Sequence, residues 1–247
     1  MGLDVANNQR ADVSGLRYGS ILIMADQDPD GSHIKGLLVN FVHTFWPKLC
    51  LHPQIRFIKH FITPLIKVTP KTGGRAFSFF SQRDFQQWSA EHQAVIGRVK
   101  YYKGLGTSTT NEAKEYFQNF EAHVKTFTVA DAQQTSAAIE KVFDKRRADD
   151  RKHWLATHDP EQEVDFTSAE TDYTAFVDRE LIQFSWYDCR RSIPCLLDGL
   201  KPGQRKILFA CFKRNLNDEV KVAQLAGYVA EHSAYHHGEQ SLQQTII

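Results

Sequence analysis

A short apolar run that ends in carboxylates constrains the fold of this 247-residue chain more than any other feature. Residues 20–25 (Ser-Ile-Leu-Ile-Met-Ala) have the length and composition of a strand, and three aspartates follow at once. Such a run is typical of a strand buried on both faces of a parallel sheet. The next apolar side chains recur at the spacing of one helix face, at Ile34, Leu37, Leu38, Phe41, Val42 and Phe45. With Ser32 placed to cap this helix and Pro47 to end it, the sequence predicts a strand, an acidic loop and a helix.

The rest of the first half predicts a mixed α/β domain. Apolar runs at residues 57–66 and 77–80 fit strands, and residues 84–88 fit the start of a helix. Residues 126–175 change character, because Ala, Gln, Asp and Lys dominate and a charged helix is predicted around residues 137–154. We interpret this stretch as a charged connector between two domains.

Three helix patterns in quick succession follow the connector. They cover residues 203–214 and 220–232 and begin again near residue 239, with Pro202 in the first turn of the first helix. Short helices with tight links are typical of a helix-turn-helix or winged-helix unit. The predicted division is therefore residues 1–125, 126–175 and 176–247.

Composition excludes several classes of protein. The four cysteines have neither zinc-ligand nor disulfide-framework spacing, so we expect free thiols. No apolar stretch approaches the roughly 20 residues that cross a bilayer, so we expect an intracellular protein without a membrane partner. Thirty Lys and Arg face 29 Asp and Glu, so the total charge does not identify a polyanionic partner. We read both ends of the chain as cuts within a longer protein.

The acidic loop is the strongest candidate for chemistry. Asp26, Asp28 and Asp30 alternate, so in an extended segment their carboxylates would point to one side. Each pair would repel by about 4 kcal/mol at 4 Å with an effective dielectric constant near 20. A divalent cation would neutralise them; oxygen ligands favour Mg²⁺ over zinc, and Gly31 permits the turn into the helix. Two alternatives stay open: an exposed acidic turn without metal, and a phosphatase of the haloacid dehalogenase type that uses Asp28 and Asp30.

Basic residues concentrate near the end of the chain. Residues 190–221 contain eight Lys and Arg against three acids, a local balance of +5. Lys201 and Arg205 lie four apart near a predicted helix N-terminus, where side chains and backbone N–H groups can bind phosphate together. Solvated surface charges are the alternative. Lys103-Gly-Leu-Gly106 is either a phosphate-binding turn or a simple strand-to-helix turn.

Three sequence blocks resemble the type IIA DNA topoisomerases, in their eukaryotic form rather than that of bacterial gyrase. The first, residues 24–38 (MADQDPDGSHIKGLL), resembles the acidic loop of the metal-binding TOPRIM domain. The second, residues 101–109 (YYKGLGTST) with 112–117 (EAKEYF), resembles the end of that domain. The third resembles the start of the DNA-binding winged-helix domain and comprises residues 191–194 (RSIP), 198–206 (DGLKPGQRK) and 235–239 (YHHGE). Only the connector matches poorly.

The resemblance implies a TOPRIM domain with a Rossmann-like α/β sheet, followed by a mainly α-helical winged-helix segment. It implies Mg²⁺ ligation by Asp26 and Asp28, with Asp30 in an outer role, and duplex DNA as the partner. It favours Lys103, Arg191, Lys201, Arg205, His236 and His237 as DNA-binding residues, with His237 the candidate for hydrogen bonding to the reacting phosphate. The parent enzyme would be an ATP-dependent homodimer that passes one duplex through a transient double-strand break, in the nucleus or alternatively in an organelle.

Departures from the family pattern bear on activity. The Glu-Gly-Asp-Ser-Ala motif, whose Glu completes the metal site in relatives, does not occur before Asp26. The attacking Tyr follows an Arg in the family, but the one Arg-Tyr pair here, Arg17-Tyr18, precedes the predicted strand, so we reject it as the nucleophile. The ATP-binding domain has no counterpart in these residues. We therefore expect a fragment without cleavage activity of its own; a DNA-binding module without activity is the non-enzymatic alternative.

Overall fold

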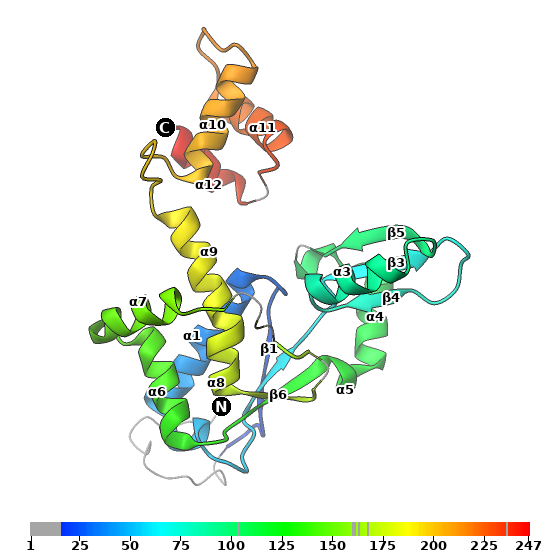
Figure 1. Cartoon of the computed structure of the whole chain (residues 1–247), viewed down its shortest axis with the longest axis vertical. Helices are drawn as coiled ribbons and strands as arrows, with labels where there is room; N and C mark the ends of the chain where they lie inside the picture. The colour runs from blue at the N-terminus through cyan, green and yellow to red at the C-terminus, as the bar shows by residue number, and fades with distance from the viewer. Residues whose placement is uncertain (1–15, 103, 160–161, 163, 167, 236) are drawn as a thin grey trace. The chain divides into compact units, whose positions relative to one another are not determined.

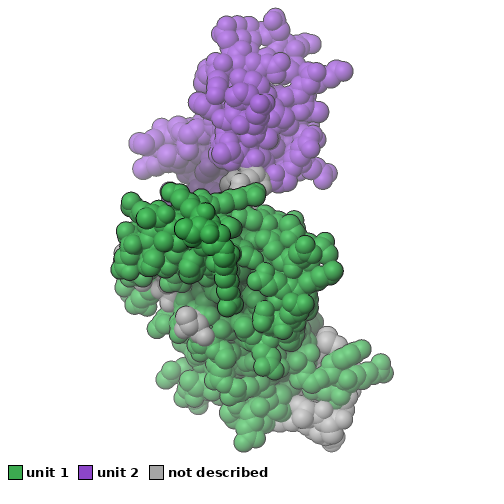
Figure 2. Space-filling view, turned by 90° about the vertical axis from the view of Figure 1, so that its right-hand side faces the viewer, with its two compact units in different colours: residues 1–184 green, residues 185–247 purple. Residues whose placement is uncertain are grey.

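The computed structural model describes residues 16–102, 104–159, 162, 164–166, 168–235 and 237–247. The chain divides into unit 1, residues 1–184, and unit 2, residues 185–247, which Figure 2 colours separately. Each unit has its own buried cluster of side chains.

Unit 1 is built on a four-stranded sheet of mixed direction with the order β1-β2-β6-β7. Its strands are β1 (Ile21–Met24), β2 (Ile58–Phe61), β6 (Val124–Thr128) and β7 (Glu170–Asp172). The β1–β2 and β6–β7 pairs are parallel, whereas β2 and β6 are antiparallel. Among the described strands β1 pairs only with β2, and Met24 is 44 % exposed, so β1 is not buried on both faces as predicted.

A second, antiparallel sheet in unit 1 has the order β4-β3-β5. It consists of β3 (Ile66–Pro70), β4 (Phe77–Phe79) and β5 (Ile96–Tyr101). The apolar run predicted at residues 57–66 thus supplies strands to both sheets, because Thr63 and Pro64 lie between β2 and β3. The predicted α/β class of the first half is confirmed.

The helices of unit 1 vary widely in length (Figure 1). They are α1 (Pro29–Phe45), α2 (Pro47–Cys50), α3 (Gln82–Glu91), α4 (Thr110–Gln118), α5 (Phe120–His123), α6 (Ala132–Phe143), α7 (Ala148–Ala156) and α8 (Tyr173–Ala175). Two short 3₁₀ turns, η2 (Leu105–Thr107) and η3 (Lys145–Arg147), and a π-helical segment, η4 (Phe176–Leu181), complete the unit. Among the described residues, no helix is both long enough and apolar enough to cross a membrane.

Helix α1 begins one turn earlier than its predicted cap. Asp28 is the cap, because its Oδ1 accepts a hydrogen bond of 2.7 Å from the Gly31 N–H, and Pro29 occupies the first helical position. Ser32, the predicted cap, instead lies in the first turns and donates a hydrogen bond to Glu180. The apolar residues whose spacing predicted the helix lie mostly on its exposed side, with Ile34 at 51 % and Phe41 at 47 %.

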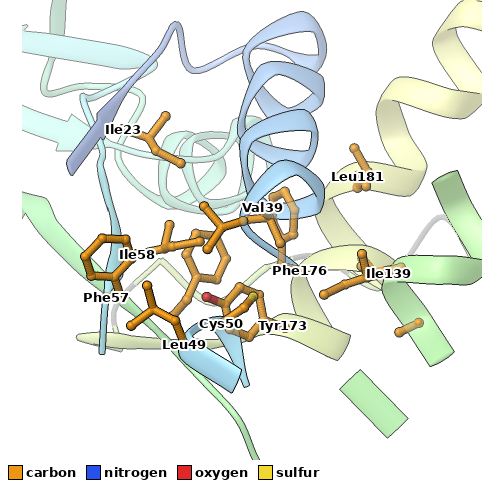
Figure 3. Close-up of a cluster of buried hydrophobic side chains, with 14 of the residues drawn as sticks. Ile23, Val39, Leu49, Cys50, Phe57, Ile58, Ile139, Tyr173, Phe176 and Leu181 are labelled. Atoms are coloured by element: carbon orange, nitrogen blue, oxygen red, sulfur yellow. The ribbon is translucent and has the colours of Figure 1, made fainter. Parts of the chain in front are cut away.

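The buried core of unit 1 lies between the four-stranded sheet and the helices. Figure 3 shows Ile23 and Ile58 of the sheet close to Val39 of α1, with Phe176 of η4 nearby. The Phe127 ring stacks on Tyr173 with centroids 4.8 Å apart. These side chains are almost completely buried, so packing fixes the position of α1 against the sheet.

The predicted connector, residues 126–175, belongs to this core. Strand β6 occupies an interior position of the sheet, Ile139 of α6 is fully buried, and Trp154 of α7 is 8 % exposed. The Trp154 indole N–H donates to Asp178, which also accepts from Lys141. The charged composition therefore describes the outer surfaces of α6 and α7, and the predicted domain boundaries are corrected to one division near residue 184.

A buried ion pair joins α1 to η4. The ammonium of Lys35, 3 % exposed, donates to Glu180 Oε1, and Ser32 Oγ donates to the same oxygen over 2.7 Å. Burial alone would raise the pKa of Glu180, but Lys35, His60 and these hydrogen bonds lower it, so the carboxylate is charged. Two segments 145 residues apart in sequence are thereby held together by charge.

We expect Lys35→Met to lower the free energy of unfolding of the chain by about 3–5 kcal/mol, because the substitution leaves the Glu180 carboxylate buried without its cation. Urea unfolding followed by circular dichroism measures this loss. The double variant Lys35→Met/Glu180→Met removes both charges and should regain most of the stability. A single variant as stable as the wild type would contradict the assignment of a buried ion pair.

Unit 2 contains three helices that all contact one another: α10 (Pro202–Lys213), α11 (Val222–His232) and α12 (Glu239–Ile246). Helix α9 (Ile182–Ser192) leads into it from unit 1. Ala210, Leu225, Val229 and Leu242 are nearly completely buried between the three helices. The helical class predicted for this end is confirmed, and the described residues of unit 2 contain no strand.

Candidate metal and nucleic-acid sites

The acidic loop lies where β1 ends and α1 begins. A Cβ atom added to Gly31 would lie 1.9 Å from the carbonyl oxygen of Asp26, so only glycine fits at this position. Asp28 caps α1, and Asp30 lies in its first turn. The backbone is extended at Asp28, but the helix begins at Pro29, so the alternation on which the expected alignment rests does not reach Asp30.

The Asp26 carboxylate packs against the turn that follows β5. A Cβ atom on Gly104 would lie 2.9 Å from Asp26 Oδ2 and 3.2 Å from its Oδ1. Gly106, two residues further on, has open space around it. The start of α1 thus approaches the backbone of Asp26, and the β5–α4 turn approaches its carboxylate, although the turn lies 78 positions away in the sequence.

A cavity of about 230 Å³ adjoins the same loop. Its walls include Asp28, Ser32 and Phe80 together with Arg179 and Gln183. The cavity is partly open to solvent, so water can reach the residues that line it, Asp28 among them. Access of this kind is a requirement for any ion that keeps part of its hydration shell.

A Mg²⁺ ion at this loop would keep most of its hydration shell. The described residues contain no group of three His, Cys, Asp or Glu side chains arranged to hold a metal. Mg²⁺ is commonly bound by one or two carboxylates, with waters and phosphate oxygens completing its shell. The close backbone approach of Gly104 to Asp26 orients one such carboxylate without a side chain in the way.

A hydrogen-bonded brace orients the β5–α4 turn. Glu112 of α4 accepts from Lys100 Nζ at 2.8 Å, from the Tyr102 hydroxyl and from the Thr109 N–H at 2.7 Å. Thr109 in turn caps α4 in a capping box with Glu112. Partial burial would raise the pKa of Glu112, but the donated hydrogen bonds lower it to about 2. Tyr102 and Thr109, on either side of the glycine turn, are thus tied to one carboxylate.

The brace should contribute stability that depends on pH. Because the folded pKa of Glu112 lies below its unfolded value, the contribution is complete above about pH 5 and is lost as the pH falls toward 2. We expect Glu112→Gln to cost about 1–3 kcal/mol at neutral pH. Urea unfolding of wild type and variant across the acidic range should show this difference shrinking as the pH falls; a difference independent of pH would contradict the brace.

In unit 2, His237 and Arg191 share a neighbour. The Tyr187 hydroxyl lies 3.4 Å from His237 Nε2, and the Arg191 guanidinium stacks over the Tyr187 ring at 4.8 Å from its centroid. Arg191 Nε also donates to Asp188 over 3.0 Å. The structure therefore brings two predicted DNA-binding residues to one aromatic side chain that the sequence reasoning did not single out.

The other predicted pair lies at the start of α10. Lys201 is the residue before the helix, and its exposed side chain forms no ion pair with the described residues. Arg205 donates two hydrogen bonds of 2.9 Å to the Asp198 carboxylate. The hydrogen bond that the Leu200 N–H donates to this carboxylate, together with those from Arg205, lowers the pKa of Asp198. Lys103 and His236, the remaining predictions, lie outside the described residues.

Sequence reasoning missed Glu112, Tyr102 and Tyr187. The Thr-Thr-Asn-Glu run at residues 109–112 has the spacing of a capping box, so the link between Thr109 and Glu112 was readable locally. The contacts of Glu112 with Lys100 and Tyr102 join a helix to a strand and depend on the turn between them. No local pattern predicts them.

Two family models together cover most of the chain. Residues 61–189 match the C-terminal associated domain of TOPRIM, and residues 191–247 match the family of DNA gyrase/topoisomerase IV A-type proteins. The first match spans more than half of the chain and includes the corrected connector. The sequence blocks at the brace and at the basic segment lie within these two regions.

Curated relatives agree along the whole sequence. The chain is 50 % identical to a DNA topoisomerase 2 of Plasmodium falciparum over 100 % of this chain and 17 % of the relative. It is 51 % identical to DNA topoisomerase 2-alpha of Rattus norvegicus, over 94 % of this chain and 16 % of the relative. It is 49 % identical to a mitochondrial DNA topoisomerase 2 of Dictyostelium discoideum, over 100 % of this chain and 19 % of the relative. The chain thus spans less than a fifth of each of these relatives.

A solved structure has the same fold. The crystal structure of the Plasmodium falciparum topoisomerase II DNA-binding, cleavage and re-ligation domain matches 100 % of this chain and 33 % of its own length, with a TM-score of 0.84 and 50 % identity. These findings agree on one class of protein. The chain has an α/β unit followed by three helices, its acidic loop packs against a glycine turn, and the two family matches follow in sequence order. The chain belongs to the type IIA DNA topoisomerase family, in its eukaryotic topoisomerase II form.

Proposed function

We propose that this chain is part of the DNA breakage and reunion core of an ATP-dependent type II DNA topoisomerase. The observation that carries the proposal is the match of the whole chain to a DNA-binding, cleavage and re-ligation domain at 50 % identity. The longer enzyme would act as a homodimer, with its ATP site outside these residues. Its compartment would be the nucleus, with an organelle as the alternative that the mitochondrial relative represents.

Asp26 and Asp28 would hold Mg²⁺, with Asp30 in a supporting role. When bound, Mg²⁺ supplies positive charge that stabilises the developing oxyanion and the leaving 3′-oxygen of a phosphodiester. Gly104 lies against the Asp26 carboxylate, and Asp28, fixed through Oδ1 as the cap of α1, lines the adjoining cavity. The chain's own contribution is therefore two carboxylates held by backbone contacts.

The basic residues of unit 2 would bind the backbone of duplex DNA. Lys201 lies at the positive end of α10, and its ammonium has no competing carboxylate among the described residues. Arg191 and His237 meet at Tyr187, an arrangement in which one cation and one hydrogen-bonding ring can address the same phosphate. Lys103 and His236 would complete the set. Membership of the topoisomerase family favours this function over the phosphatase alternative.

We expect calorimetric titration of the chain with Mg²⁺ to give heat that is absent in Asp26→Asn/Asp28→Asn and that strengthens in the presence of a short duplex.

Gly104→Ala should weaken Mg²⁺ binding about tenfold, because its Cβ displaces the Asp26 carboxylate. Gly106→Ala is the matched control, since a Cβ there meets nothing. Equal affinities for the two alanine variants would contradict the role of Gly104.

We also expect that the 247-residue polypeptide alone does not become covalently linked to DNA. The proposed nucleophile is a Tyr after an Arg, and the one such pair, Arg17-Tyr18, precedes β1. Incubation with supercoiled plasmid and Mg²⁺, followed by denaturing electrophoresis, tests for an adduct. An adduct that persists in Tyr18→Phe would contradict this expectation, and one that disappears in Tyr18→Phe would identify Tyr18 as the nucleophile.

A further inference from the structure

The small sheet of unit 1 has two chemically different faces. Paired residues of neighbouring strands share a face, so the pairing of Val68 with Phe77 and Val99 forms an apolar face. Rings of α3 cover this face, because Trp88 packs on Phe77 at a centroid distance of 4.9 Å. The opposite face carries the cations of the sheet, at Lys67, Arg98 and Lys100.

Helix α4 neutralises two of the three cations on the polar face. Lys67 Nζ lies 2.9 Å from Glu115 and Lys100 Nζ lies 2.8 Å from Glu112. Arg98, opposite Thr69, is exposed, and none of the described residues forms an ion pair or hydrogen bond with its guanidinium. The neutralisation is therefore selective and leaves one end of the sheet positively charged.

Two further cations lie at that same end. The turn that joins β3 to β4 carries Lys71 and Arg75, both exposed and both without an ion-pair partner among the described residues. Strand β5 begins opposite Pro70, which places Arg98 at the end of the sheet where this turn lies (Figure 1). Glu91, the last residue of α3, is the acidic residue closest in sequence to the start of β5. The three cations Lys71, Arg75 and Arg98 thus outnumber this one acidic residue.

We propose that Lys71, Arg75 and Arg98, here called the hairpin surface, bind the phosphate backbone of duplex DNA in addition to the residues of unit 2. The inference rests on the proposed function, which supplies the duplex. Exposed cations without internal partners bind phosphates at little desolvation cost and release counterions from the DNA when they do so. Lys and Arg on phosphates carry no sequence information, so this contact is independent of DNA sequence.

The turn favours nucleic acid over a lipid surface. Residues 71–76 (Lys-Thr-Gly-Gly-Arg-Ala) contain no aromatic or large aliphatic side chain, whereas interfacial membrane binding needs apolar anchors. Gly73 and Gly74 have positive φ angles of 74° and 106°, which shape a tight turn between the two cations. The three-stranded sheet behind the turn holds it in a fixed position relative to Arg98.

The test measures binding of a short fluorescent duplex to the full 247-residue chain by anisotropy across a series of salt concentrations. We expect Lys71→Gln/Arg75→Gln/Arg98→Gln to reduce the slope of log affinity against log salt by about 2–3, because each lost phosphate contact removes about 0.9. Affinity at low salt should fall at least about tenfold for every duplex sequence, with an unchanged melting temperature.

The matched control is Arg17→Gln/Lys114→Gln/Lys145→Gln, three exposed cations elsewhere in unit 1 with the same change in charge. A hairpin variant whose slope equals that of the control would overturn the inference. If Lys201→Gln/Arg205→Gln weakens binding while the hairpin variant does not, the hairpin surface fails and the proposed function stands. A wild-type chain without salt-dependent DNA binding would overturn both the inference and the proposed function. If the hairpin variant loses binding to vesicles of anionic lipid while its DNA binding is unaffected, the hairpin surface binds lipid instead.

Discussion

The arrangement of unit 1 depends on a pair of charges that are almost completely shielded from water. Lys35 and Glu180 lie on α1 and η4, and neither side chain is more than 7 % exposed. Removing two charges from water is costly. The attraction between Lys35 and Glu180 and the hydrogen bond from Ser32 must offset this desolvation cost. A shift of α1 by one turn would leave both charges buried and separate. The pair therefore fixes the register of α1, and with it the place of Asp28 at the first turn of that helix.

The same register explains why the acidic loop is so confined. Since α1 starts directly after the loop, Gly31 must pass within contact distance of the Asp26 carbonyl, and a side chain at residue 31 would push helix and strand apart. Gly104 imposes a similar restriction at the Asp26 carboxylate. Two glycines far apart in sequence thus lie against one residue, Gly31 at the backbone of Asp26 and Gly104 at its carboxylate. The Glu112 brace holds the second glycine in its turn.

Local patterns predicted the elements of this fold well, and long-range contacts decided what the patterns could not. Periodicity found α1 and the helices of unit 2, but it could not tell which side of α1 is buried, because that depends on Glu180, 145 residues away. The spacing of Ile34 and Phe41 therefore predicted the helix correctly, but the side of the helix that it predicted to be buried is exposed. Charge composition predicted a connector where Ile139 and Trp154 enter the core, since surface residues outnumber buried ones in α6 and α7. The aspartates of the loop were readable from sequence, whereas the approach of Gly104 was not.

The predicted DNA-binding residues are not energetically equivalent. Arg205 is already bound to Asp198 by two hydrogen bonds, so a phosphate must replace a carboxylate, and the net gain is the difference between two similar interactions. Lys201 has no such competitor among the described residues, and the same holds for Lys71, Arg75 and Arg98. A polyanion binds most favourably to cations that have no ion-pair partner within the protein, so the number of unpaired cations matters more than the total number of cations. By that measure we expect Lys201 to contribute more to DNA binding than Arg205, although both residues lie in the same sequence block.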